Sequence, residues 1–303
     1  MATVEDGARW VAAMRANDHA AAWALSDAVL KARDPATRDD PCLPYHLRWV
    51  WDGRAFDGRD CLVRCYHGLG DTVQFARFLP LLARRAASVV VEAPARLLGL
   101  LQRIAPAANV RFLPFDVVHP LPPSECDIEI TELAFALRAT PADAPWPYLS
   151  TPRAILPHGT VGLCYAAGDW DGARGVPPAL FAPLCACSRC ITLVPQATGL
   201  PVLNPRGCPF DMDATAALVA ACDLVITVDT LIAHLAGAMG RPTWLLLKAD
   251  PDWRWPVDSD ATPWYPSMHI HAQRTAGDWR EVMADVARDL GAFTLSPAAS
   301  KAP

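Results

Sequence analysis

The chain has 303 residues, of which 52% are hydrophobic, and its formal net charge is -5. A chain of this length exceeds the size at which a single core stops growing, so two domains are expected. The acidic balance, without clusters of Lys or Arg, argues against nucleic acid as a partner.

The amino-terminal residues and the apolar runs indicate where the protein resides. Met1–Asp6 are polar and acidic, whereas a secretory signal has a basic start followed by an apolar stretch. The longest apolar runs, such as Thr243–Leu247, are far shorter than the roughly 20 residues that cross a bilayer. We therefore expect a cytoplasmic protein without a transmembrane segment, which at most contacts the cytoplasmic face of the inner membrane peripherally.

Ten cysteines occur, most of them inside apolar segments, where a free cysteine behaves as a small buried hydrophobe. We expect them to be reduced. Cys185, Cys187 and Cys190 could supply three thiolate ligands, but no second Cys or His pair follows at zinc spacing. The sequence therefore predicts no metal site.

The first residues form a separate segment. Residues 6–32 are rich in alanine, and their apolar residues recur at helical spacing. Residues 34–44 combine prolines with aspartates, which is typical of a linker. We predict a helical appendage and linker over residues 1–44.

Residues 45–155 contain short apolar strands that alternate with helical stretches. The predicted strands are Cys61–Cys65, Val89–Val91, Val110–Leu113 and Ile128–Ile130, and the predicted helices are Thr72–Arg85 and Arg96–Ile104. This alternation indicates a parallel sheet with crossover helices, hence a first α/β lobe. The proline-rich residues 140–157 mark the boundary with the next lobe.

A second α/β series occupies residues 156–275. Its predicted strands are Thr160–Tyr165, Cys190–Val194, Leu224–Val228, Thr243–Leu247 and Met268–His271, and its predicted helices are Pro178–Ala186, Ala214–Cys222 and Leu231–Met239. Residues 276–303 are expected to form a C-terminal helix, Trp279–Leu290, and a frayed tail from Leu295.

The first motif with chemical content is the turn His67–Asp71, between a predicted strand and helix. In open α/β sheets, ligands bind beyond the carboxyl ends of the strands, which places a carboxylate of this turn near a ligand. Asp71 could then accept a proton from an acceptor hydroxyl. Asp71 could equally cap the helix that begins at Thr72, and the residues alone leave both readings open.

The second motif follows the predicted strand Leu224–Val228, where Asp229 and Thr230 lead into a helix that contains His234. The start of such a helix presents unpaired N–H groups and the positive end of the helix dipole, which suit a diphosphate. The alternative makes Thr230 a simple helix cap and His234 a satisfied polar group.

The third motif is Lys248 at the end of a predicted buried strand, followed by Trp253 and Arg254. Lysine is rare in this chain, so a cation directly after a buried strand is a candidate phosphate contact. Tryptophans in such a loop either pack or stack on a base or sugar, and packing is the more frequent role.

Together these segments resemble the heptosyltransferase-like glycosyltransferases, of the glycosyltransferase family 9 type, and most closely the branch commonly fused to tetratricopeptide repeats. The resemblance runs from about Trp49 to Leu290. The segments that carry it are Gly68–Thr72, Phe78–Pro80, Asp223–Thr230, Ala233–Ala238, Gly240–Pro242, Pro251–Trp255 and Pro263–Pro266.

The resemblance implies a GT-B fold, with two Rossmann-like lobes whose parallel sheets face a central cleft, in addition to the short N-terminal helices. The amino-terminal lobe would bind the acceptor and the carboxyl-terminal lobe the nucleotide sugar. The implied reaction is an inverting, metal-independent transfer of a sugar from a nucleotide diphosphate sugar to a glycan, lipid-linked or protein acceptor. It needs no cofactor and is typical of bacterial cell envelope synthesis.

The resemblance also assigns roles to residues of this chain. Asp71 falls on the family's catalytic base. The candidate donor-binding residues are Gly70, Tyr165, Arg174, Gln196, Met212, Asp229, Thr230, Leu231, His234 and Lys248. The candidate acceptor or cleft residues are His67, Gln74, Trp253 and Arg254.

Several departures from the family pattern keep other functions open. Leu231 stands where relatives have a small residue, residues 165–170 replace a more typical stretch, and Gly175 replaces the serine expected beside Arg174. A non-catalytic binding or scaffold protein and a sugar nucleotide epimerase are the alternatives. An oxidoreductase is disfavoured, because Val73 stands where the third glycine of a dinucleotide-binding turn belongs.

Overall fold

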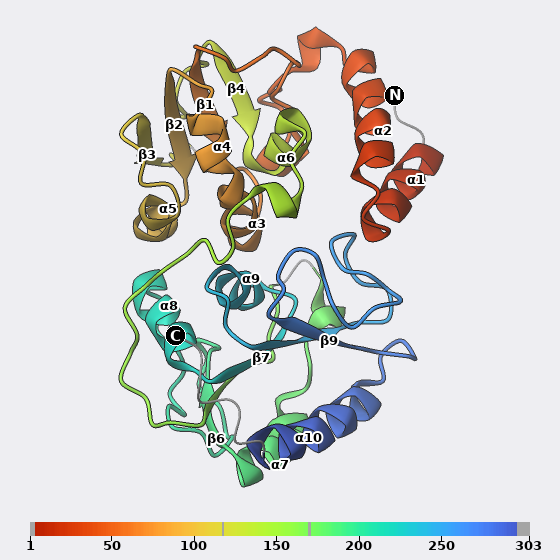
Figure 1. Cartoon of the computed structure of the whole chain (residues 1–303), viewed down its shortest axis with the longest axis vertical. Coiled ribbons are helices and arrows are strands. Elements are labelled where there is room, and N and C mark those ends of the chain that lie inside the picture. Colours follow the sequence, from red (N-terminus) through yellow and green to blue (C-terminus); the bar gives the residue numbers. More distant parts are fainter. Residues whose placement is uncertain (1–3, 117, 169–170, 296–303) are drawn as a thin grey trace. The chain divides into compact units, whose positions relative to one another are not determined.

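The computed structural model describes residues 4–116, 118–168 and 171–295. The chain divides into two compact units, Met1–Ser150 and Thr151–Pro303, which Figure 1 draws in red to yellow-green and in green to blue. The structural division thus falls inside the proline-rich stretch, and the finer domain limits given above stay predictions. The residues 296–303 of the predicted tail lie outside the described residues.

The chain begins with two helices, α1 (Val4–Arg15) and α2 (His19–Ala32), which lie side by side in Figure 1. Asp18 caps α2 by accepting a hydrogen bond from the amide of Ala21 at 3.0 Å. The indole of Trp10 donates to the hydroxyl of Ser26 at 3.1 Å and so joins the two helices. The predicted N-terminal helices are therefore confirmed.

The first unit contains a four-stranded parallel sheet in the order β3-β2-β1-β4. Its strands are β1 (Asp60–Arg64), β2 (Ser88–Ala93), β3 (Val110–Pro114) and β4 (Cys126–Glu129). Its further helices are α3 (Leu69–Phe75), α4 (Leu79–Ala83), α5 (Leu98–Ile104) and α6 (Leu133–Leu137). The middle of β1, residues 61–63, is apolar and buried because both faces of a parallel sheet are covered.

The predicted helix Thr72–Arg85 is wrong as a single element. The structure begins α3 at Leu69 and separates it from α4 by a 3₁₀ turn, Ala76–Phe78. Pro80 is the second residue of α4, and a proline has no N–H for a helical hydrogen bond to the preceding turn. Phe75 and Phe78 are nonetheless fully buried, so the whole segment still packs in the core.

The second unit contains a five-stranded parallel sheet in the order β6-β5-β7-β8-β9. Its strands are β5 (Thr160–Cys164), β6 (Arg189–Thr192), β7 (Leu224–Val228), β8 (Thr243–Leu247) and β9 (Met268–Ala272). Its helices are α7 (Ala182–Cys187), α8 (Met212–Ala221), α9 (Leu231–Ala238) and α10 (Trp279–Leu295). Helices α7 and α10 pack together, and so do α8 and α9 (Figure 1).

Close packing in the second unit depends on glycine in α9. A Cβ atom added at Gly237 would lie 2.4 Å from the ring of Tyr265, which is fully buried. The helix can therefore approach this ring only because the side chain is missing. Among the described residues of the chain, no helix combines the length and apolar character needed to cross a membrane.

The predicted α/β class, with two Rossmann-like parallel sheets, is confirmed. In the first unit the strand order reverses direction between β1 and β4, and in the second unit between β5 and β7. Ligands of open α/β sheets bind outside the carboxyl ends of the strands at such switch points. Each unit therefore has one position at which a ligand is expected.

Candidate functional site

The switch point of the first unit carries an ion pair. His67 follows β1 and Glu129 ends β4, and their Nδ1 and Oε1 atoms are 3.0 Å apart. Glu129 is buried, and it also accepts hydrogen bonds from the amides of Tyr66 at 3.3 Å and Thr131 at 2.7 Å. The sequence predicted His67 at this site but missed Glu129, because its position beside β1 follows only from the strand order.

Asp71 is the third residue of α3, and its carboxylate closes the turn. Its Oδ2 atom accepts the amide N–H of Gly68 at 3.0 Å, and the hydroxyl of Thr72 donates to the carbonyl of Gly68 at 3.1 Å. The capping role left open by the sequence is therefore present. A carboxylate offers about four acceptor positions, so this capping bond does not exclude proton acceptance by Asp71.

The other predicted residues of this turn differ in exposure. Gly70, the second residue of α3, is half-buried, and so is His67. Gln74 is fully buried within α3. Hence His67 and Gly70 are accessible from this turn, whereas the amide of Gln74 is enclosed.

A buried ion network that the sequence did not predict lies at the end of β1, before this turn. Arg64, the last residue of β1, pairs with Glu92 of β2 at 3.3 Å and with Asp127 of β4 at 3.0 Å. All three side chains are almost completely buried. Burial raises the pKa of Glu92, and the nearby Leu121 amide and Arg64 oppose that shift. The network joins three adjacent strands near the switch point.

The switch point of the second unit contains the start of α9. Thr230 is the residue before the helix, its backbone is extended, and its side chain makes no capping hydrogen bond. The first amides of a helix have no partner within the helix, so this end can bind an anion. Leu231, the first residue of α9, is half-buried beside these amides.

Asp229 and His234 are held in a buried polar cluster at this helix. His234 is fixed by the hydroxyl of Tyr265, 2.9 Å from Nδ1, and by the ring of Trp255, which stacks on it at 5.8 Å between centroids. Its Nε2 lies 4.0 Å from Asp229 Oδ1. Burial raises the pKa of Asp229, although the neighbouring Trp255 opposes the shift. His234 thus has the contacts of a satisfied core residue.

The loop after β5 connects this helix to the rest of the sheet edge. Arg174 donates from Nη1 to the backbone carbonyl of Asp229 at 2.8 Å. Lys248, which follows β8, forms an ion pair with Asp171 at 2.8 Å, and this hydrogen bond lowers the pKa of Asp171. The two predicted cations therefore fasten residues 171–175 over the carboxyl ends of β7 and β8.

A pocket of about 610 Å³ opens beside the same loop. Its lining includes Tyr165 after β5, Gly172 and Gly175 of the loop, and Gln196 after β6. Tyr165 is buried against Phe181, whereas Gln196 is exposed at the pocket. Two predicted donor-binding residues, Tyr165 and Gln196, thus line one cavity.

Two residues that the sequence did not single out, Asn204 and Gly207, fix the backbone on either side of the lining residue Val194. Gly207 has a φ of +103°, and a Cβ atom there would lie 2.2 Å from the carbonyl oxygen of Pro195. Asn204 accepts the amide N–H of Thr192 and donates to its carbonyl, both at 2.8 Å. An Asn and a Gly in one loop are the available sequence signal for such a turn.

Trp253 and Arg254 form a packed group in the loop after β8. The guanidinium of Arg254 lies 4.5 Å from the centre of the Trp253 ring and pairs with Asp252 at 2.7 Å. Trp253 also contacts the ring of Trp264 edge to face, at 6.1 Å between centroids. These contacts correspond to the packing role that the sequence favoured for the tryptophans.

Most predicted donor-binding residues therefore meet at one edge of the second sheet. Met212 does not join the pocket lining, since it is buried as the first residue of α8. Residues 169 and 170 of the unusual 165–170 segment lie outside the described residues. The predicted residues at this edge are Tyr165, Arg174, Gln196, Asp229, Thr230, Leu231, His234 and Lys248.

Residues 208–275, which include β7, α9 and β8, match the model of glycosyltransferase family 9 (heptosyltransferase). The chain therefore carries a heptosyltransferase-like glycosyltransferase segment, which confirms the resemblance to this family. The assignment to the branch fused to tetratricopeptide repeats stays a prediction. The matched segment contains Asp229, Thr230, His234 and Lys248.

Individual proteins are similar to this chain in sequence or in fold. Protein FlbA of Caulobacter vibrioides is 32% identical over 131 residues, which are 42% of this chain and 22% of FlbA. The chain thus matches about a fifth of the length of this curated relative. E. coli ADP-heptose LPS heptosyltransferase II aligns over 78% of this chain and 98% of its own, with 17% identity and a TM-score of 0.52. The iron-containing dodecameric glycosyltransferase TibC of enterotoxigenic E. coli aligns over 76% and 67%, with 16% identity and a TM-score of 0.52. These structures share the fold.

Proposed function

We propose that this chain is an inverting glycosyltransferase that uses a nucleotide diphosphate sugar. The observation that carries the proposal is the loop 171–175 of the second unit. Gly172 and Gly175 line the pocket, and Arg174 between them donates to the carbonyl of Asp229, two residues before α9. One loop thus joins a cavity of ligand size to an anion-binding helix start.

The second unit would bind the donor. A cavity of about 610 Å³ is within the usual range for small-molecule sites, and Tyr165 and Gln196 would contact the nucleoside there. The diphosphate would lie at the first amides of α9, near Arg174. Preorganised donors of this kind stabilise the charge that develops on a leaving diphosphate.

The first unit would bind the acceptor and supply the base. Asp71 would remove the proton of an acceptor hydroxyl while that oxygen attacks the anomeric carbon. The bond between the anomeric carbon and the diphosphate oxygen would break on the opposite face, so that the configuration inverts. The nucleoside diphosphate leaves with the electron pair of that bond.

Metal independence, the donor and the acceptor are parts of the proposal. Arg174 and the α9 amides would provide the positive charge that other transferases obtain from a metal ion. TibC was solved with ADP-D-β-D-heptose, which makes this compound the first donor to test. A glycan, a lipid-linked sugar or a protein would serve as the acceptor, at the cytoplasmic face of the inner membrane.

A non-catalytic binding protein is the second candidate, and two contacts favour it. Lys248 is already paired with Asp171 at 2.8 Å, and Asp71 already caps its own helix. Such a protein would bind a nucleotide sugar, or a fragment of one, without turnover.

The decisive experiment compares Asp71→Asn with the parent chain. Asparagine keeps an oxygen that can accept the Gly68 amide but cannot act as a base, so we expect kcat to fall about 10²- to 10⁴-fold. Donors are first ranked by calorimetry, with ADP-, GDP- and UDP-sugars beside ADP-D-β-D-heptose, and turnover is then measured with acceptor extracts.

Asp143→Asn is the matched control. Asp143 accepts the amide of Thr140 at 2.7 Å in a similar capping arrangement of the same unit, so its replacement should leave kcat within about twofold. Equal turnover by Asp71→Asn and the parent would show that Asp71 is not the catalytic base. Donor binding without any turnover in the parent would favour the binding protein.

A further inference from the structure

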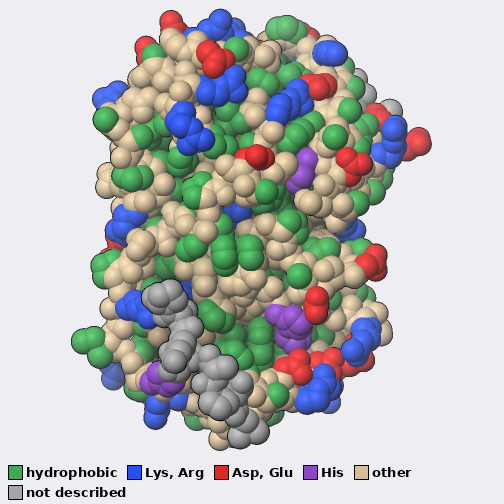
Figure 2. All heavy atoms as spheres, in the orientation of Figure 1, with side chains coloured by type: hydrophobic (Ala, Val, Ile, Leu, Met, Phe, Trp, Pro, Cys, Tyr) green, Lys and Arg blue, Asp and Glu red, His purple; other side chains and the backbone are tan. Residues whose placement is uncertain are grey.

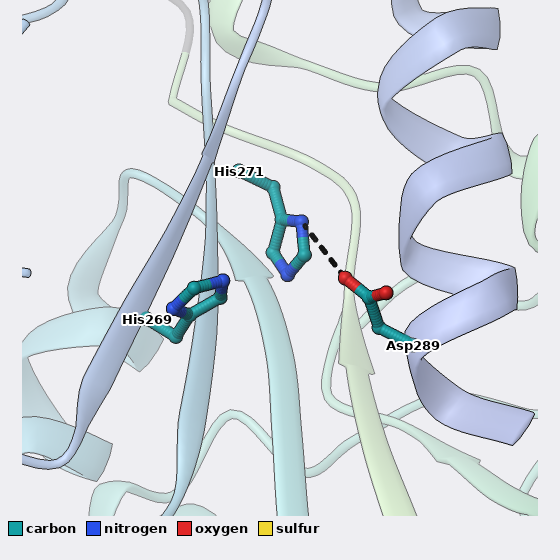
Figure 3. Close-up of side chains that lie close together, drawn as sticks. All are labelled: His269, His271 and Asp289. Carbon is teal, nitrogen blue, oxygen red and sulfur yellow. Dashed lines mark ion pairs between the residues drawn. The ribbon is translucent and has the colours of Figure 1, made fainter. Parts of the chain in front are cut away.

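A cluster outside the proposed transfer site combines two histidines with a carboxylate. His269 and His271 lie two positions apart on β9 and therefore point to the same face of the sheet. Asp289 of α10 lies beside them (Figure 3). One ring nitrogen of each histidine and one carboxylate oxygen lie within 4.8 Å of one another. Two imidazoles and a carboxylate form a common ligand set for first-row transition metals.

His271 is the buried member of the cluster. Its Nδ1 atom lies 4.0 Å from Asp289 Oδ2, while its Nε2 atom is buried and has no hydrogen-bond partner among the described residues. A buried polar atom without a partner is costly. Burial and the neighbouring His269 also lower the pKa of His271 to about 4, so the ring is neutral at pH 7.

Charged groups on α10 and in the loops on either side of β9 surround the cluster. Asp260 lies 3.6 Å from His269, and Asp285 of α10 adds another carboxylate near His271. Arg288 is the opposing cation, 3.5 Å from Asp289, and Arg274 pairs with Asp285 at 3.2 Å. Figure 2 shows histidine side chains bordered by acidic and basic ones over β9 and α10. Three carboxylates and two guanidinium groups leave the surroundings acidic.

We propose that His269, His271 and Asp289 bind a divalent first-row transition metal ion, with water completing the coordination. Zinc lies about 2.0–2.2 Å from nitrogen and oxygen ligands, so the three ligand atoms must approach one another more closely. The side chains of His269 and Asp289 are 46% and 39% exposed and can rotate toward the buried His271.

The metal ion would fasten the edge of the second sheet. β9 is an edge strand that pairs only with β8 in this sheet, and α10 packs against it. A ligand that binds only the folded form stabilises that form. The ion would thus hold strand and helix together without taking part in sugar transfer.

Zinc binding tests the proposal directly. The complete chain without a histidine tag is stripped with EDTA and titrated with ZnCl₂ by calorimetry, and its thermal unfolding is recorded with and without zinc. We expect one equivalent to bind, and Tm to rise by roughly 5–10 °C at saturation. His269→Gln and Asp289→Asn should each weaken binding at least tenfold. Both side chains are partly exposed, so the metal-free variants should melt like the metal-free parent.

His119→Gln and Asp116→Asn are the matched controls. His119 also faces a carboxylate, Asp116 at 3.4 Å, but in an exposed turn of the first unit. Both controls should bind zinc like the parent. The proposal is wrong if zinc does not bind, or if either His269→Gln or Asp289→Asn leaves the affinity unchanged. It is also wrong if bound Co²⁺ shows sulfur charge-transfer absorption, which would place the ion at cysteines.

Discussion

The two switch points are built by the same topology but carry different groups. In the first unit, His67 and Glu129 form an ion pair beside the turn of Asp71. In the second unit, Arg174 bonds to a backbone carbonyl beside the start of a helix. One switch point thus collects proton-exchanging side chains, whereas the other collects N–H donors and a fixed cation.

This difference follows from what comes after each strand. β1 leads into a glycine-bearing turn that a carboxylate closes, and the adjacent β4 ends in a second carboxylate. β7 leads directly into α9, whose first turn contains no acidic residue. A parallel sheet only determines that these segments meet, so the chemistry of each site depends on a few residues in the connecting loops.

Beyond the test of Asp71, the largest effect is expected when Arg174 of the second unit is replaced. Arg174→Met should lower kcat/KM by about 10²- to 10³-fold, because it removes a preorganised donor near the leaving group. Steady-state kinetics with the selected donor measure this effect. Arg189→Met, which replaces a guanidinium bonded to His158 at an exposed site, is the control and should retain activity. Unchanged kcat/KM in Arg174→Met would assign Arg174 a structural role only.

The next effect concerns Glu129, the buried carboxylate at the switch point of the first unit. Glu129→Gln should lower the free energy of unfolding by about 2 kcal/mol, since a buried charged acceptor loses part of its hydrogen bonds. Urea unfolding measures the change. Glu125→Gln is the control: Glu125 accepts the Asp60 amide at an exposed position, so its loss should be smaller, about 0.5 kcal/mol. Equal losses in both variants would mean that burial at the switch point adds nothing.

A smaller effect is expected at Gly207, whose backbone packs against Pro195 beside the pocket. Gly207→Ala forces a side chain into a left-handed backbone against Pro195, which costs about 1–3 kcal/mol. Thermal unfolding should therefore shift down by roughly 2–10 °C. Gly199 lines the pocket itself, but a Cβ atom added there meets nothing within 4 Å, so the Tm of Gly199→Ala should not change. A Gly207→Ala protein as stable as Gly199→Ala would contradict the packing described here.

The smallest effect concerns the dependence of stability on pH, which has opposite signs for Asp229 and Asp171. Burial raises the pKa of Asp229 above its usual 3.8, so the folded form keeps a proton that the unfolded form releases. The parent therefore loses stability as pH rises from about 4 through the raised pKa. Asp229→Asn lacks this loss and should gain in Tm relative to the parent over that range.

Asp171 provides the contrasting case. Its hydrogen bond to Lys248 lowers its pKa, so its stabilising contribution is present above the usual 3.8 and is lost as pH falls through the lowered pKa. Asp171→Asn should thus be less stable than the parent at neutral pH and equal to it in acid. Thermal unfolding between pH 3 and 8 measures both differences. If the two variants changed Tm in the same direction at neutral pH, the opposite pKa shifts of Asp229 and Asp171 would be disproved.

The sequence predicts the fold well where strands are fully buried. Leu224–Val228 and Thr243–Leu247 are continuous apolar runs, and the structure gives β7 and β8 these limits. It predicts less where packing overrides local pattern, as in the interrupted helix around Pro80. The choice between one helix and two depends on a core that no short window of sequence contains.

The candidate site is predictable only in part. Asp229 and Thr230 directly follow β7, and Asp71 lies at the start of the helix after β1. Their places at the sheet edges could therefore be expected from the order of elements. Glu129 meets His67 across 62 positions, and Arg174 reaches Asp229 across 55. Such pairs are determined by the strand order. The alternate histidines on β9 were visible in the sequence, but their carboxylate partner on α10 was not.

The two N-terminal helices differ in how firmly they are attached. α1 buries no residue, whereas α2 is tied to the first unit, for example by the pair between Asp27 and Arg138 at 2.6 Å. Local opening requires little free energy where few apolar contacts break. The amide hydrogens of α1 should therefore exchange with deuterium long before those of β1, and a protease should cut at α1 first.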